Sequence, residues 1–188
     1  MKTLLVLLAI AAPVFAQVTP GTPGEATPGT PPVPPTVAKA KPLGASEKKF
    51  VKDSLEGMYY VMDLAGKAKT GAKIEGTKTE AEALKVDLGK VWAEVAGYAS
   101  NHNEKIPAEL TGGDKGKAER LGKSGDKFDK EYFKLVNREF EKLVKTFESA
   151  AKSAQDPEVK KIAGNWEATL KGHMAKLDAA EKEAAKAK

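Results

Sequence analysis

The residues of this chain best suited to acid–base or metal chemistry are its two histidines, His102 and His173, because the 188-residue sequence contains no cysteine. Without a thiol there is no cysteine nucleophile, no redox-active Cys pair and no thiolate zinc site. GxSxG, Walker A, GxGxxG and HExxH motifs do not occur either. The many acidic residues often stand three or four positions from a lysine, a spacing typical of ion pairs on a helix surface. We therefore predict that the protein is not an enzyme and uses no cofactor.

The two histidines differ in the apolar pattern around them. His173 follows Leu170 by three residues and precedes Leu177 by four, so it lies on the apolar stripe of a predicted helix. We expect a buried core residue whose two ring nitrogens are hydrogen-bonded. His102 lies where a helical pattern fades into asparagines, so we expect it to be exposed at a helix terminus.

Helices must position these side chains. Through residues 46–188 the apolar residues recur every three or four positions, which predicts helices and no strands. The first helix is expected to have Ser46 as its N-cap and to end at Gly71. The second is expected to start near Thr79, where Thr79 and Glu82 match a capping box.

The second half of the chain predicts two further helices. The glycine-rich segment 110–125 is expected to be a long connection with one helical turn around residues 117–121. The third helix is expected to have Asp126 as its N-cap, and Asp156 with Pro157 predicts the N-cap and first turn of the fourth. Four helices with one apolar stripe each predict an all-α domain, residues 46–188, built as an antiparallel four-helix bundle.

Residues 1–16 are predicted to be a removable export signal. Lys2 precedes an apolar run at residues 4–12, small residues follow, and cleavage is expected before Gln17. The run is shorter than the roughly 20 residues that span a bilayer. We therefore expect an exported protein, periplasmic or extracellular, with no transmembrane segment after cleavage.

Residues 17–45 are predicted to form a disordered linker rich in proline, threonine and glycine. They hold eight of the 11 prolines and repeat Thr-Pro-Gly three times. Such a composition favours an extended, solvated chain. We expect a spacer, with a ligand for proline-recognising partners or an O-glycosylated stalk as the alternatives.

The charge of the chain is modest and mixed. Lys and Arg number 31 against 26 Asp and Glu, for a formal net charge of +5, and the two signs alternate along the sequence. This pattern predicts no nucleic-acid partner. The lysines near both ends of the domain are expected to be solvated, with binding of anionic envelope polymers as the alternative.

A series of short motifs runs in order between Phe50 and His173. They are Phe50-Val51-Lys52, Glu56-Gly57-Met58, Asp63-Leu64-Ala65-Gly66-Lys67-Ala68, Ile106-Pro107-Ala108-Glu109-Leu110, Phe128-Asp129-Lys130-Glu131-Tyr132, Leu143-Val144-Lys145-Thr146-Phe147-Glu148, Asp156-Pro157-Glu158-Val159-Lys160 and Thr169-Leu170-Lys171-Gly172-His173. In content and order they resemble the bacterial domain-of-unknown-function family 4142 (DUF4142). The resemblance implies an exported protein with a ferritin-like four-helix bundle, often described as an outer-membrane protein, and it implies no particular activity.

The resemblance also implies a metal site. The family carries an acidic residue on the first helix, an Asp-His pair on the second and on the third, and a histidine on the fourth. The corresponding residues here are Asp63, Asp87-Leu88, Glu139-Phe140 and His173. Carboxylates and an imidazole suit Fe, Mn or Zn, but leucine and phenylalanine have no lone pair to offer a metal. The candidate metal ligands are therefore a degraded set, namely Asp63, Asp87, Glu139 and His173.

Two hypotheses follow from the sequence. The first is an exported, non-catalytic helical bundle that serves as a binding or structural module of the bacterial cell envelope, with envelope components as its partners. The alternative is a metal-binding (Fe, Mn or Zn) ferritin-like protein with a degraded ligand set.

Overall fold

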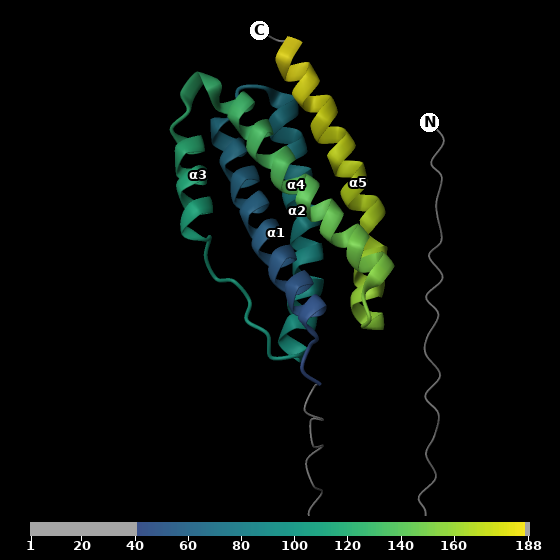
Figure 1. Ribbon diagram of the computed structural model, residues 1–188. Coiled ribbons are helices and arrows are strands. Elements are labelled where there is room, and N and C mark those ends of the chain that lie inside the picture. Colours follow the sequence, from purple (N-terminus) through teal and green to yellow (C-terminus); the bar gives the residue numbers. More distant parts are fainter. Residues whose placement is uncertain (1–40, 187–188) are drawn as a thin grey trace, which may run out of the picture. The chain divides into compact units, whose positions relative to one another are not determined.

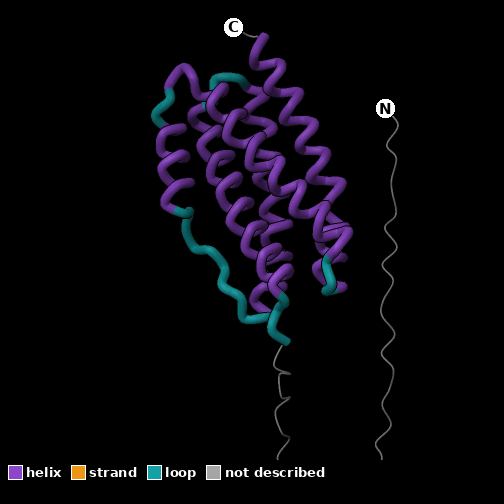
Figure 2. Tube along the Cα trace, viewed as in Figure 1, coloured by secondary structure: helices purple, strands orange, loops and turns teal. Residues whose placement is uncertain are grey.

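The computed structural model describes residues 41–186, so the predicted export signal and most of the predicted linker lie outside the described residues. The described part contains five α-helices, one short 3-10 helix and no strand (Figures 1 and 2). The helices are α1 Ala45–Gly71, α2 Glu75–Asn101, α3 Gly112–Gly122, α4 Phe128–Ser153 and α5 Pro157–Lys186, with the 3-10 helix η1 at Gly125–Lys127. The all-α class is thereby confirmed.

The four long helices lie side by side around one core, and the shorter α3 lies outside them (Figure 1). Three-residue turns, 72–74 and 154–156, join α1 to α2 and α4 to α5. Because such short turns reverse the chain at once, each pair runs antiparallel. α1 also packs against α4, α2 packs against α5, and α3 contacts α1 and α4.

The core consists of the apolar stripes predicted from the periodicity. Phe50 and Phe147 meet edge-on across α1 and α4, with ring centroids 5.2 Å apart. Such a pair buries two large side chains and adds about 1 kcal/mol beyond their area. Other fully buried side chains come from all the long helices and include Leu55, Met58, Leu84, Leu88, Tyr132, Phe140 and Leu177.

The predicted count of four helices is wrong by one, because 112–122 is a helix rather than a loop with one turn. Thr111 is its N-cap: the Thr111 hydroxyl accepts the N–H of Asp114 and donates to the Asp114 carboxylate at 2.8 Å. Ala118 and Leu121 are buried beneath it. Packing of these two side chains and a good cap outweigh the helix-breaking tendency of its glycines.

The predicted capping box at Thr79 is also wrong. α2 begins four residues earlier, at Glu75, and the Thr79 hydroxyl donates to the Glu75 carbonyl within the helix at 3.1 Å. The early start depends on Asp129 of α4, whose carboxylate accepts the backbone N–H groups of Lys73 and Ile74 at 3.0 and 3.5 Å. A residue more than fifty positions away therefore fixes the turn into α2.

Of the other three predicted N-caps, two are wrong and one is confirmed. Ser46 and Asp126 are not N-caps: α1 begins after Gly44, and the 3-10 helix precedes α4. The Asp126 carboxylate instead forms an ion pair with Lys73. Asp156 is confirmed as the cap of α5, because its carboxylate accepts the N–H groups of Glu158 and Val159 at 2.8 and 3.2 Å.

Within residues 41–186, no helix combines the length and the apolar character needed to cross a membrane.

Candidate functional site: a buried histidine between two carboxylates

His173 lies in the middle of α5 with its ring directed at α2. The residue is 3% exposed, so the prediction that it is buried is confirmed. Its Nδ1 lies 2.9 Å from Glu80 Oε1, and its Nε2 lies 3.1 Å from Asp87 Oδ2. Glu80 and Asp87 are seven residues, or two turns, apart on α2, so they flank the ring from one helix face. We name this arrangement the Glu80–His173–Asp87 clamp.

The electrostatics of the clamp favour a charged imidazole. The hydrogen bond to Glu80 raises the pKa of His173 above its usual value, and the bond to Asp87 adds to the rise, while burial and Lys176 oppose it. The ion pair with Lys90 and the bond to His173 lower the pKa of Asp87. In the protonated state both ring N–H groups donate to carboxylates. The clamp is then an ionic link between α2 and α5.

Aromatic rings close the clamp from α4. The Phe140 ring stands edge-on to the imidazole, with centroids 6.5 Å apart and planes at 85°. The Tyr132 side chain is fully buried, and its pKa is raised by burial and by the nearby Glu80 carboxylate. The hydrogen bond between His173 and Glu80 therefore lies in surroundings where the lack of water strengthens it, whereas Asp87 is partly exposed.

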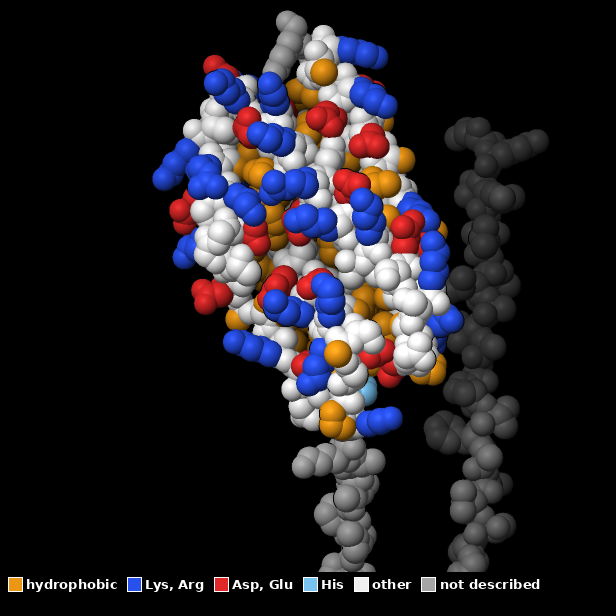
Figure 3. All heavy atoms as spheres, in the orientation of Figure 1, with side chains coloured by type: hydrophobic (Ala, Val, Ile, Leu, Met, Phe, Trp, Pro, Cys, Tyr) orange, Lys and Arg blue, Asp and Glu red, His pale blue; other side chains and the backbone are white. Residues whose placement is uncertain are grey.

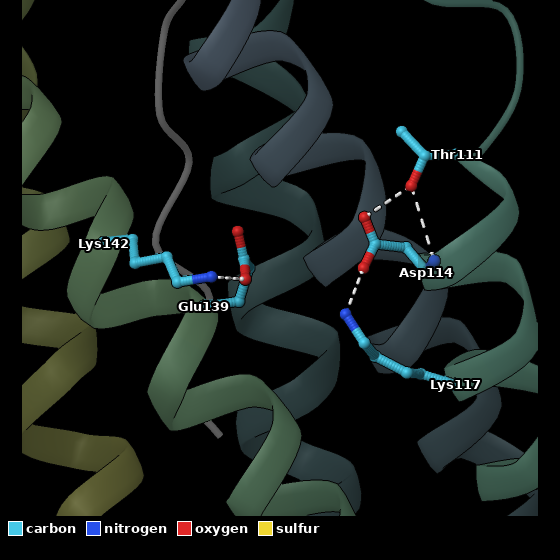
Figure 4. A network of polar contacts seen from close by, with 5 residues as sticks. All are labelled: Thr111, Asp114, Lys117, Glu139 and Lys142. Carbon is cyan, nitrogen blue, oxygen red and sulfur yellow. Dashed lines mark hydrogen bonds and ion pairs between the residues drawn. The ribbon is translucent and has the colours of Figure 1, made fainter.

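Glu139, another predicted ligand, lies in a different place. With Asp53, Glu56 and Asp114 it lines an acidic cavity of 270 Å³ between α1, α3 and α4. Glu139 forms an ion pair with Lys142 of its own helix at 2.9 Å, while Thr111 and Lys117 bond to Asp114 (Figure 4).

Asp63, the ligand predicted on α1, forms an ion pair with Lys67 one turn along the same helix, at 3.6 Å. No contact in the described part of the chain links Asp63 or Glu139 to His173. The structure therefore brings together two of the four predicted ligands, Asp87 and His173.

The second histidine, His102, is the C-cap residue of α2. Its Nδ1 lies 2.9 Å from the carbonyl oxygen of Lys41, and its ring rests on Tyr98 at a centroid distance of 4.6 Å. The helix-terminal position is as predicted, but the ring is half-buried rather than exposed. It fastens the first described residues to the end of the α1–α2 pair.

Comparison with known proteins identifies the family of the chain. A family model described as "Domain of unknown function (DUF4142)" matches residues 32–180, more than half of the chain. The chain belongs to the DUF4142 family. Neither a curated protein nor a solved structure matches it. The resemblance drawn from the sequence motifs is thereby confirmed.

The metal site implied by the resemblance can now be tested against the geometry of this DUF4142 protein. The two positions expected to hold imidazoles are Leu88 and Phe140, both fully buried in the core. Both ring nitrogens of His173 are already bonded to carboxylates, Nδ1 to Glu80 and Nε2 to Asp87. The other oxygen of Asp87 bonds to the Lys90 ammonium at 2.7 Å. Across residues 41–186, no three His, Asp or Glu side chains are grouped so as to hold a metal ion. Because Fe, Mn and Zn sites in proteins use three or more such ligands, the residues present do not fit a metal.

One clamp residue of this DUF4142 protein, Glu80, was not predicted. Glu80 and Asp87 share a helix face, which the heptad spacing indicates, but many other acidic pairs in the sequence share that spacing. Only the packing of α5 on α2 selects this pair. The seven-residue spacing of the two carboxylates is therefore visible in the sequence, but it is too common there to identify Glu80 as a partner of His173.

Proposed function

We propose that this DUF4142 protein is an exported, non-catalytic helical module of the bacterial cell envelope, with a binding or structural role. The observation that supports the proposal is that the buried imidazole of His173 is fully hydrogen-bonded within the protein. Both nitrogens of His173 are engaged by Glu80 and Asp87, so neither is free for a substrate or a metal. The side chain with the greatest capacity for catalysis thus links two helices.

The proposed architecture is a ferritin-like, antiparallel four-helix bundle with α3 as an addition on its side. Support comes from the two antiparallel pairs, α1 with α2 and α4 with α5, and from their contacts with each other. A bundle of this kind keeps its shape through its apolar core, without a bound group. The polar clamp adds an ionic link between the faces of α2 and α5 that the apolar core brings together.

Export is proposed from the sequence of residues 1–16, and a spacer role from the proline-rich residues 17–45. Expression of the full chain with its own signal tests this part. We expect a mature protein that begins at Gln17 and is recovered in the periplasmic or outer-membrane fraction. Recovery of the uncleaved chain in the cytoplasm would contradict export.

A metal titration tests whether the protein binds a metal ion, as the alternative hypothesis requires. The exported chain, residues 17–188, is stripped of metal and melted with and without Fe²⁺, Mn²⁺ and Zn²⁺, with circular dichroism as the signal. We expect a helical protein whose melting temperature does not change with any ion. An ion held at 100 times its dissociation constant would add about 2.7 kcal/mol, or roughly 5–10 °C in a protein of this size.

The same titration on His173→Leu distinguishes the two hypotheses from the sequence. A metal-induced shift that is lost in the variant would overturn the proposal and establish the metal-binding alternative. Loss of helical signal on removal of metal would overturn it as well. No shift in either protein supports the non-catalytic module.

A further inference from the structure

A cavity at the corner between α3 and α4 is lined by basic side chains and takes no part in the clamp. Its volume is 330 Å³, at the lower end of the roughly 300–1,000 Å³ of small-molecule sites. Lys117, Arg120 and Lys127 line it, against a single acidic residue, Glu131. Figure 3 shows lysine and arginine side chains along the left edge of the molecule, with acidic side chains between them.

Two acidic residues close to Lys127 in the sequence do not pair with it. Asp126 pairs with Lys73 of the α1–α2 turn, and the buried Asp129 accepts backbone N–H groups of the same turn. In the described part of the chain no carboxylate oxygen lies within 4.0 Å of the charged groups of Arg120 or Lys127. Among the described residues, Arg120 and Lys127 therefore line one cavity without an ion pair, and Glu131 is the acidic residue of its lining.

The backbone that carries these two cations is fixed. The Arg120 carbonyl accepts the N–H of Lys123 at 3.1 Å, and the Leu121 carbonyl accepts both the N–H and the hydroxyl of Ser124, at 3.1 and 2.7 Å. The Ser124 carbonyl in turn accepts the N–H of Lys127 at 3.1 Å. This chain of hydrogen bonds sets the spacing between Arg120 and Lys127 before any ligand binds, which reduces the entropic cost of binding.

The side chains of Arg120 and Lys117 differ in their surroundings. Arg120 Nη1 lies 3.5 Å from the point where a Cβ on Gly116 would stand, so the guanidinium folds back over a position with no side chain. The Lys117 ammonium lies between Asp114, at 2.7 Å, and the Tyr60 ring, 5.8 Å from its centroid. The Lys117 ammonium is thereby held in place, whereas Arg120 and Lys127 are exposed.

The chemistry of the lining selects the ligand. A guanidinium offers paired N–H donors to an oxyanion and an ammonium adds a point charge, so together they suit the several oxygens of a phosphate group. The floor of the cavity is apolar, with Leu121 1% exposed and Leu135 half-buried. We propose that this cavity binds the phosphate group of an anionic ligand, with Arg120 and Lys127 as the residues that hold it.

The proposal is independent of the proposed function, since a phosphate site requires neither export nor a structural role for His173. A phosphate group can belong to a soluble compound or to the headgroup of an anionic lipid. The two sources share the same contacts to Arg120 and Lys127. The experiment therefore includes one probe for each.

Backbone-amide NMR of the exported chain, residues 17–188, is recorded during titration with sodium phosphate and, separately, with sodium chloride at equal ionic strength. We expect phosphate-specific shifts confined to residues 117–135. In parallel the protein is sedimented with phosphatidylcholine vesicles, with and without phosphatidylglycerol.

The Arg120→Gln/Lys127→Gln variant removes both cations, and Lys160→Gln/Lys161→Gln is the matched control with the same change of charge on exposed positions of α5. Loss of a charge-assisted hydrogen bond weakens binding about tenfold or more. We expect that loss in the first variant and less than a twofold change in the control.

Binding of free phosphate supports a site for soluble phosphate compounds. Binding to phosphatidylglycerol vesicles alone supports a headgroup site, provided that the first variant loses it and the control does not. Absence of binding to both probes, equal weakening in both variants, or shifts spread over the whole surface would overturn the proposal.

Discussion

Replacement of His173 by leucine should lower the stability of the protein by about 2 kcal/mol near pH 6 and by much less near pH 9. Each charge-assisted hydrogen bond of the clamp is worth about 1.5–3 kcal/mol when well buried. The His173 side chain is 4% exposed and that of Glu80 14%, so the whole of this stabilisation applies to their bond. The Asp87 side chain is 33% exposed and keeps its ion pair with Lys90, so its bond contributes less.

The introduced leucine offsets part of this loss of stability. It places an apolar side chain beside Phe140 in the core, which contributes about 1–2 kcal/mol through burial. The net change of about 2 kcal/mol corresponds to a fall in melting temperature of roughly 4–8 °C for a domain of this size. The bond from the protonated imidazole to Glu80 is the main source of the loss, because both side chains are largely buried.

The pH dependence distinguishes an ionic clamp from mere packing. The pKa of His173 is raised above about 6.5, so its stabilisation is complete below that pH and is lost as pH rises through the folded-state pKa. The pKa of Asp87 is lowered, so its stabilisation is present above about pH 3.9 and is lost as pH falls through the folded-state pKa. The difference between wild type and His173→Leu should therefore be largest at about pH 5–6.5.

Urea unfolding followed by circular dichroism, repeated from pH 5 to pH 9, measures this difference. His102→Gln serves as the control, because it removes the other imidazole and leaves the clamp intact, so it should retain the wild-type pH dependence. A difference between wild type and His173→Leu that is the same at pH 5.5 and pH 9 would refute a charged clamp.

Five further substitutions, at four positions, test other parts of the fold by the same unfolding assay. Gly71→Ala would place a methyl group against the Phe128 ring and should cost about 1–3 kcal/mol, whereas Gly89→Ala meets nothing within 4 Å and should gain about 0.5–1 kcal/mol. Asp156→Ala should cost about 1 kcal/mol through loss of the α5 cap, and Asp156→Asn should be nearly neutral. Asp129→Ala should cost about 2 kcal/mol, because two N–H groups at the start of α2 lose their acceptor. A neutral Asp129→Ala would mean that α2 does not depend on this contact.

Local signals in the sequence predicted some of these features correctly. The periodicity around Leu170 and Leu177 places His173 on a buried face, and Asp156 before Pro157 predicts the start of α5. Each of these depends on residues within one or two helical turns. Such features follow from helical geometry alone and need no knowledge of distant contacts.

Features that depend on distant residues could not be predicted in this way. The predicted capping box at Thr79 matches the local pattern, yet Asp129 moves the start of α2 to Glu75. The glycines of 112–122 favour a loop, yet the burial of Leu121 makes the segment a helix. In both cases a tertiary contact outweighs a local preference of about 1 kcal/mol per residue.

The sequence by itself determined the helical class, the buried position of His173 and the family, because helical periodicity and the order of motifs are properties of the chain. Only the tertiary structure decided the partners of the imidazole. The packing of α5 on α2 pairs His173 with Glu80 and Asp87, while Glu139 lies in another cavity and Asp63 bonds along its own helix. Four helices can bring their polar residues together in many ways, and the fit of their apolar faces selects one of them.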